Sequence, residues 1–216
     1  MPLSTFYNLP EEKRKKILEC AIDEFARHDY NSASISKIVS RAGIAKGSLY
    51  QYFVDKSDLY HYLLELAALK KNELLAKTSS PDPEMNLFDI LQALFREMAK
   101  FQLLYPDLAK IGYRAIYGKS PFPEDIVASA AQSTQQYFLK LIEVGKQRGE
   151  VRPEVDSGVT AFIFTAALVE LNGYLMTQVQ IDAAVPMTEQ NYSIYEVEVA
   201  RIYRQMIAIL KSGIAM

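Results

Sequence analysis

The groups best suited to binding phosphate and base edges in this 216-residue chain lie between residues 46 and 56. A cation, hydroxyl groups, an amide and a glycine occur together there. The candidate residues are Lys46, Gly47, Ser48, Tyr50, Gln51, Tyr52 and Lys56. Hydroxyl and ammonium groups bind phosphate oxygens, glutamine and lysine can reach base edges, and glycine and serine allow a backbone to come close. The combination favours contact with nucleic acid.

Two short helices joined by a glycine must position these groups. Apolar residues of the first helix fall at i, i+3, i+4 and i+7, which are Ile35, Ile38, Val39 and Ala42. Ser34 can cap this helix, and we count its hydroxyl among the phosphate-binding candidates. Gly43 can end it, because a left-handed residue there needs no Cβ. In the second helix Leu49 and Phe53 point inward, which leaves the phosphate-binding groups outside.

The charge pattern indicates that the site is local. The whole chain carries 24 Lys and Arg against 26 Asp and Glu, a net charge of -2. No acid occurs between Tyr30 and Val54, whereas Lys37, Arg41 and Lys46 all lie in that stretch. A positive field confined to one region is expected when only that region touches nucleic acid.

Residues 11–66 resemble the tetracycline-repressor (TetR) family of bacterial transcription regulators. The family pattern is met by Ser34, Ile38, Ala42, Gly43, Ile44, Lys46, Gly47, Leu49, Tyr50, Tyr52, Phe53, Lys56 and Leu59. Two positions depart from it, since Val39 replaces the usual alanine and Asp29 the usual glycine. The resemblance implies that Lys56 meets a DNA phosphate and that the partner is double-stranded operator DNA.

Beyond residue 66 the resemblance is one of architecture. No segment shows the alternation of a strand, so we expect an all-α chain of about nine helices that begins with a three-helix helix-turn-helix domain. We expect the DNA-binding domain at residues 1–54, a connecting helix at 55–80 and a ligand-binding and dimerisation domain at 81–216. Breaks are predicted at 78–83 and in a loop that contains Pro186.

Composition favours a cytoplasmic protein. Cys20 is the single cysteine, which excludes a disulfide within one chain and suits a buried helix thiol. The N-terminal residues lack the pattern of a signal peptide. Residues 159–176 are apolar enough to suggest a membrane span, but Glu170 in its middle would be costly in lipid. We therefore expect a helix buried between protein surfaces and no membrane partner.

Aromatic residues are frequent between residues 98 and 138, where the TetR resemblance implies a ligand cavity. Tyrosine offers a flat apolar wall with a polar tip, although a core role accounts for most of these residues. The ligand-binding candidates are Phe101, Tyr105, Tyr113, Tyr117, Tyr137, Phe162 and Glu170. Charges are few in the stretch, which favours a small apolar effector. Arg114 and Glu170 are the exceptions, and Glu170 would equally suit a pair across a dimer interface.

The last two long helices carry apolar stripes that would suit either an internal core or a subunit interface. In the TetR family these helices form a four-helix dimer interface. The interface candidates are Phe162, Ala166, Val169, Gly173, Val199, Ile202, Met206 and Ile209. We expect a homodimer because paired recognition helices bind half-sites related by two-fold symmetry.

Catalysis has little support in the sequence. The two histidines, His28 and His61, stand in no nucleophile, metal or acid–base motif, so we expect no enzyme, no metal and no cofactor. The favoured hypothesis is a ligand-responsive regulator, in this family usually a repressor, that a small apolar effector releases from its operator. A helical lipid carrier or interaction protein without DNA binding stays open as the alternative. The presence of Lys46, Gly47, Tyr50 and Lys56 argues against that alternative.

Overall fold

The computed structural model describes residues 2–76, 85–118, 121–178 and 187–216. Their regular secondary structure is helical, apart from one isolated bridge between Val151 and Ala215. The all-α prediction is confirmed. Ten helices occur in these ranges instead of about nine, because the single turn α1 (Ser4–Tyr7) was not predicted. The predicted breaks at 78–83 and at Pro186 lie outside the described residues.

Contacts divide the chain into two compact units. The first contains residues 1–70 and 105–128, and the second contains residues 71–104 and 129–216. Residues 105–128 join the first unit because α7 (Pro106–Tyr117) packs on α2 (Glu11–Arg27). The Arg114 guanidinium donates to the carbonyl of Ala26 at 2.9 Å, which satisfies a free carbonyl at the end of α2. The domain boundaries at residues 54 and 80 stay predictions.

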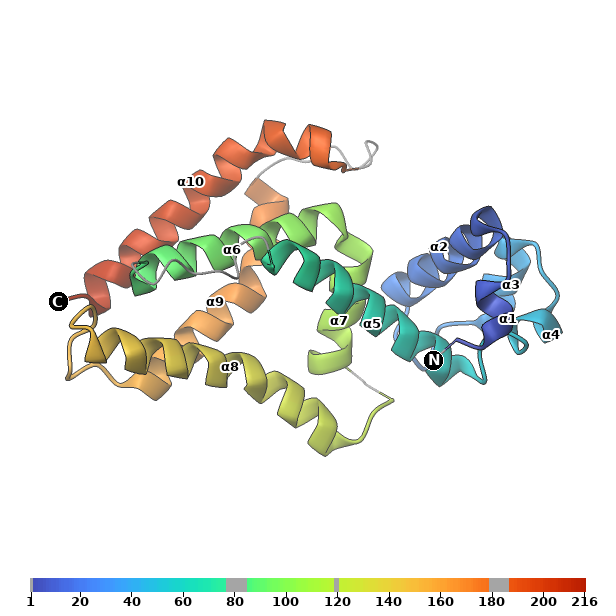
Figure 1. The fold of residues 1–216 in the computed structure, drawn as a ribbon, viewed down its shortest axis with the longest axis horizontal. Coiled ribbons are helices and arrows are strands. Elements are labelled where there is room, and N and C mark those ends of the chain that lie inside the picture. Colours follow the sequence, from blue (N-terminus) through green and yellow to red (C-terminus); the bar gives the residue numbers. More distant parts are fainter. Residues whose placement is uncertain (1, 77–84, 119–120, 179–186) are drawn as a thin grey trace. The chain divides into compact units, whose positions relative to one another are not determined.

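The first unit packs helices of 4 to 20 residues around an aromatic core. Besides α1, α2 and α7 it contains α3 (Ile35–Ala42), α4 (Lys46–Leu49) and most of α5 (Lys56–Leu75) (Figure 1). Its core includes Phe6, Phe25, Phe53 and Tyr60, with Phe6 to Phe53 and Phe25 to Tyr60 both at 5.0 Å between ring centroids. Helices as short as α3 and α4 are marginal by themselves, so this packing must stabilise them.

The second unit is built from long helices: α6 (Leu87–Leu104), α8 (Glu124–Gln147, with its first turns in the other unit), α9 (Ser157–Gln178) and α10 (Glu189–Ile214). Helix α10 lies beside α6 in the opposite direction (Figure 1). Lys211 lies 5.3 Å from the ring of Phe88, and Lys100 lies 3.8 Å from Glu189 at the other end. Thr188 and Asn191 form a capping box that starts α10 about five residues before the predicted position.

Helix α9 has the length and composition of a membrane span over Ser157–Leu175, with a mean hydropathy of 1.4. One such helix is weak support for a membrane, because the core helix of a water-soluble protein has the same composition. One face of α9 packs in the core of the second unit through Ala161, Phe164 and Leu175. Another face, with Phe162 and Ile163, is exposed in the single chain.

Candidate functional site

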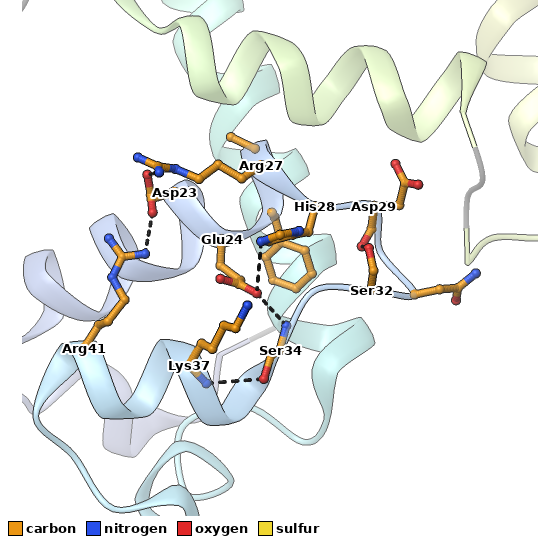
Figure 2. A network of polar contacts seen from close by, with 12 residues as sticks. Asp23, Glu24, Arg27, His28, Asp29, Ser32, Ser34, Lys37 and Arg41 are labelled. Atoms are coloured by element: carbon orange, nitrogen blue, oxygen red, sulfur yellow. Dashed lines mark hydrogen bonds and ion pairs between the residues drawn. The ribbon is translucent and has the colours of Figure 1, made fainter.

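The first turn of α3 is held by two side chains. Ser34 caps it as predicted, because its hydroxyl accepts from the Lys37 amide at 3.3 Å. The Ser34 amide itself donates to Glu24 Oε1 at 2.8 Å, and Glu24 as a whole is only 3% exposed (Figure 2). His28 Nε2 lies 3.9 Å from the same carboxylate oxygen. A buried carboxylate on α2 therefore fixes where α3 begins.

Asp23 holds the other end of α3. Its carboxylate accepts from Arg27 on its own helix at 2.7 Å and from Arg41 in the last turn of α3 (Figure 2). Burial alone would raise the pKa of Asp23, but hydrogen bonds from Arg41 and Arg27 lower it below the ordinary value. These side chains line a polar hollow of about 480 Å³ between α2 and α3. The ionised Asp23 thus ties α3 to α2.

The turn between α3 and α4 has the predicted geometry. Gly43 adopts φ of 70°, the left-handed region, and its amide donates back to the carbonyl of Ser40. In the segment that follows, Leu49 and Phe53 are buried as predicted. Lys46, Gly47, Tyr50 and Gln51 are exposed and Ser48 is half-buried. The candidate groups for phosphate and base contacts therefore lie on the outer side of this segment.

Tyr52 is a correction to the sequence prediction. It was expected on the outer face, but its side chain is only 6% exposed. Regular helix ends at Leu49, and the amides of Tyr52 and Phe53 both donate to the Leu49 carbonyl at 2.9 Å. Tyr52 therefore follows Leu49 by one tight turn and shares its inward side. Its ring packs on Phe6 at 6.1 Å between centroids, and a DNA contact by Tyr52 stays a prediction.

The N-terminal segment packs on residues 46–53, a contact that was not predicted from the sequence. Leu3 donates its amide to the Tyr52 carbonyl at 2.8 Å, and the Thr5 hydroxyl donates to the Gln51 carbonyl. Phe6, which follows Thr5, is almost fully buried and packs against Phe53. These contacts satisfy carbonyls that the short helix leaves free and reduce the freedom of its last turn.

Lys56 begins α5 and faces the loop before α3. Its ammonium lies 4.7 Å from the centre of the Tyr30 ring and donates to the Asn31 carbonyl at 3.3 Å. Partial burial lowers the pKa of Lys56, and the nearby Glu24 charge opposes that shift. The cation is therefore positioned by the protein before any phosphate arrives.

A cavity of about 520 Å³ lies in the second unit. Its walls come from the end of α5, from Met85, and from α6, α8 and α9, and they are mainly aliphatic and aromatic. The polar groups in the lining belong to Lys71, Ser133, Thr134 and Tyr137. Burial raises the pKa of Tyr137 above its ordinary value. The size and lining are those of a site for a small molecule.

Two family models match this chain. The model described as bacterial regulatory proteins of the tetR family matches residues 17–63, and the tetracyclin repressor-like C-terminal domain matches residues 85–215. The chain belongs to the TetR family. This membership confirms the predicted resemblance and the predicted function at its general level, a ligand-responsive DNA-binding transcriptional regulator.

Relatives agree with this TetR assignment. A TetR-family regulator of Chloroflexus aurantiacus is 36% identical, and its crystal structure matches 100% of this chain and 99% of its own with a TM-score of 0.90. The HTH-type transcriptional repressor SCO4008 of Streptomyces coelicolor is 26% identical over 73% of this chain and 77% of that repressor. The A-factor receptor protein of Streptomyces griseus is also 26% identical, over 71% of this chain and 51% of the receptor.

The ligand candidates of this TetR-family protein are dispersed. Of the predicted set, Tyr137 lines the cavity. Phe101 is buried, Tyr105 is half-buried, and Phe162 and Glu170 are exposed. Tyr113 and Tyr117 pack against each other on α7 at 5.1 Å and are largely exposed. The sequence analysis named none of the aliphatic lining, because an apolar residue beside a cavity has the same pattern as one in the core.

The dimer candidates of the TetR-family chain separate into two groups. Val199 and Ile202 are buried in the core of the second unit, because that side of α10 packs on α6. Of the two readings that the sequence left open for these residues, the internal core is the one that the structure shows. Ala166, Val169 and Met206 are half-buried, while Gly173, Phe162 and Ile209 are exposed, the last two by 62% and 70%. Ile194 and Val197, which were not predicted, are exposed on α10 as well.

Proposed function

We propose that this regulator is a cytoplasmic, homodimeric repressor that binds double-stranded operator DNA and leaves it when a small, largely apolar effector binds. The observation that carries the DNA-binding part is the sidedness of residues 46–53. Leu49 and Phe53 are buried, while Lys46, Tyr50 and Gln51 are exposed. The apolar cavity in the second unit supports the effector part.

Release follows from a population shift. Two recognition elements of a dimer must match successive major grooves, roughly 34–36 Å apart. An effector that binds one dimer geometry more tightly than the other shifts the equilibrium toward the geometry that it prefers. The free energy of this shift is at most the difference between its binding free energies for the two geometries. In this scheme Lys56, Tyr50 and Ser34 hold the phosphate backbone, and Lys46, Ser48 and Gln51 meet base edges.

A gel-shift titration tests the division of roles. Lys56→Ala is expected to weaken binding to all sequences alike and to reduce the slope of log K against log salt by about one, because one phosphate contact is lost. Gln51→Ala is expected to relax specificity at one position, by roughly 1–3 kcal/mol if a bidentate contact is lost. Lys140→Ala, which removes an exposed cation from α8, is the matched control and should change neither quantity.

Two outcomes of that titration contradict the assignment. If the salt slope of Lys56→Ala is unchanged, Lys56 does not contact a phosphate. If the site preference of Gln51→Ala is unchanged, Gln51 does not contact a base. If the wild-type chain binds no segment of its own promoter region, the helical lipid carrier replaces the repressor as the better hypothesis.

The proposed dimer rests on exposed apolar side chains of α9 and α10, chiefly Phe162 and Ile209. Burying such a surface against a second copy removes it from water. Phe162→Glu combined with Ile209→Glu should therefore convert the dimer to a monomer in sedimentation analysis and abolish tight operator binding. Val54→Glu, at an exposed apolar position of the first unit, should leave the mass unchanged. A double variant that remains dimeric would place the interface elsewhere.

A further inference from the structure

The described residues that line the cavity of the second unit carry charge of one sign. Most of its wall is apolar and includes Leu94, Met98, Phe138 and Leu168. Among the lining residues that the structure describes, Lys71 on α5 is the one charged side chain and none is an acid. A ligand that fills this cavity therefore meets the ammonium group of Lys71.

Lys71 is available to pair with such a ligand. It is half-buried, and no carboxylate or ring in the described ranges pairs with it. Its neighbour Lys70, by contrast, lies 6.0 Å from the centre of the Tyr105 ring. Because a cation beside an apolar cavity loses part of its hydration, an anion that replaces the lost water is bound more strongly there than on an open surface.

The remaining polar groups of the lining fit the same ligand. The hydroxyls of Thr134 and Tyr137 on α8 can each donate a hydrogen bond, as an anion requires. Within the described lining, one lysine and the hydroxyls of Ser133, Thr134 and Tyr137 suit a single anionic group better than a polyanion, which would bury several charged oxygens. The same described residues include no acid that would balance a cation.

We infer that the effector is an amphiphile with one anionic group, a carboxylate on an apolar body, and that Lys71 is the residue that binds its charge. This inference rests on the proposed function, because it names the class of effector for the proposed cavity. It adds a requirement that an apolar cavity alone does not impose: the charge of the ligand decides its affinity. The apolar body lies against Leu94, Met98 and Phe138, and the carboxylate pairs with the lysine.

Three probes of equal chain length separate charge from apolar contact. Decanoate, decanol and decylamine are titrated into the full-length protein by calorimetry, and the same compounds are tested for release of operator DNA. Decanoate is expected to bind about tenfold more tightly than decanol, since a charge-assisted hydrogen bond contributes at least that factor. Decylamine is expected to bind most weakly. Higher ionic strength should weaken decanoate more than decanol.

Substitutions at Lys71 assign the effect to this residue. Lys71→Met keeps the length of the side chain and removes its charge, so the advantage of decanoate over decanol should disappear while decanol affinity is kept. Lys71→Glu should reverse the order and favour decylamine. Lys140→Met on α8 is the matched control and should retain the wild-type order. Unchanged melting of the apo variants in a thermal scan confirms that they fold.

The outcomes distinguish the inference from the proposed function. If decanol and decanoate bind equally and both release the operator, the anionic class is wrong while the ligand-responsive repressor stands. An unchanged preference for decanoate in Lys71→Met and Lys71→Glu overturns the role of Lys71. If no decyl compound binds although the operator is bound, the inference and the apolar effector are both wrong, and the DNA-binding proposal is untouched.

Discussion

The two units differ in how their helices are held in place. In the first, α3 and α4 have 8 and 4 residues, and side chains hold both ends of α3: Glu24 and Ser34 at its start, Asp23 at its end. In the second, α6, α8, α9 and α10 have 18 to 26 residues, and a cavity of about 520 Å³ lies among α5, α6, α8 and α9.

This difference indicates where each unit can change shape. A surface that must match phosphates gains from elements fixed before binding, because less conformational freedom is then lost on the DNA. A unit that accepts a ligand needs empty volume, and the side chains that line this volume lose van der Waals contacts. Side-chain hydrogen bonds accordingly hold both ends of α3, whereas the described lining of the cavity is mainly aliphatic and aromatic.

The largest expected effect comes from emptying one aromatic core at a time. Phe6→Ala removes a ring that packs on Phe53 at 5.0 Å, and Phe95→Ala removes one that packs on Phe138 at 6.3 Å and on Tyr203 at 5.9 Å. Each should lower the free energy of unfolding by roughly 3–5 kcal/mol. In hydrogen exchange, Phe6→Ala should lose protection at residues 46–53 and Phe95→Ala on α8 and α10. The same pattern of lost protection in both variants would contradict the comparison.

A smaller effect is expected from two matched caps. Ser34 caps α3 in the first unit and Thr188 caps α10 in the second, each by accepting from a backbone amide at 3.3 Å. Replacing either by alanine should cost about 1 kcal/mol of stability, and replacing either by glycine only a few tenths. Ser34→Ala should also weaken operator binding in a gel shift, whereas Thr188→Ala should not. Equal losses of operator affinity in both variants would show that only general stability matters.

The smallest effect concerns pH and the pair that ties α3 to α2. The pKa of Asp23 lies below its ordinary value of 3.8, so its contribution to stability is complete above that pH and is lost as pH falls through the lower, folded value. Asp23→Asn should therefore melt at a lower temperature than wild type at neutral pH, with the two curves converging in acid. Arg41→Gln should reproduce the loss. A constant difference across the acid range would exclude this ionisation as the cause.

Local signals explain why the helix-turn-helix was predicted well. The cap at Ser34, the left-handed Gly43 and the inward Leu49 and Phe53 are each encoded within a few residues. Tyr52 was misplaced because the prediction continued a regular helix beyond Leu49, where the chain forms tighter turns instead. A prediction from periodicity fails at the residue where the period changes.

Features that depend on contacts between residues far apart in the chain were not predicted from the sequence. Glu24 accepts from an amide ten residues away, and Phe6 is buried by residues 46 or more positions along the chain, so neither role has a local pattern. An apolar stripe in the sequence likewise does not identify the surface that packs on it. In the structure α10 packs on α6, and Val199 and Ile202 are buried in the core of the second unit. Lys71 has the pattern of an ordinary surface lysine and is distinguished only by the cavity beside it.

The hydrogen bond from Leu3 to the Tyr52 carbonyl bears on how the protein should be produced and labelled. Pro2 is itself buried, so any affinity tag or fluorophore fused ahead of it begins beside the turn that ends in Phe53. Such a fusion should disturb operator assays more than the same tag placed after Met216, whose side chain is exposed. Measurements of DNA affinity are therefore best made with the label at the carboxyl end or with the amino-terminal tag removed.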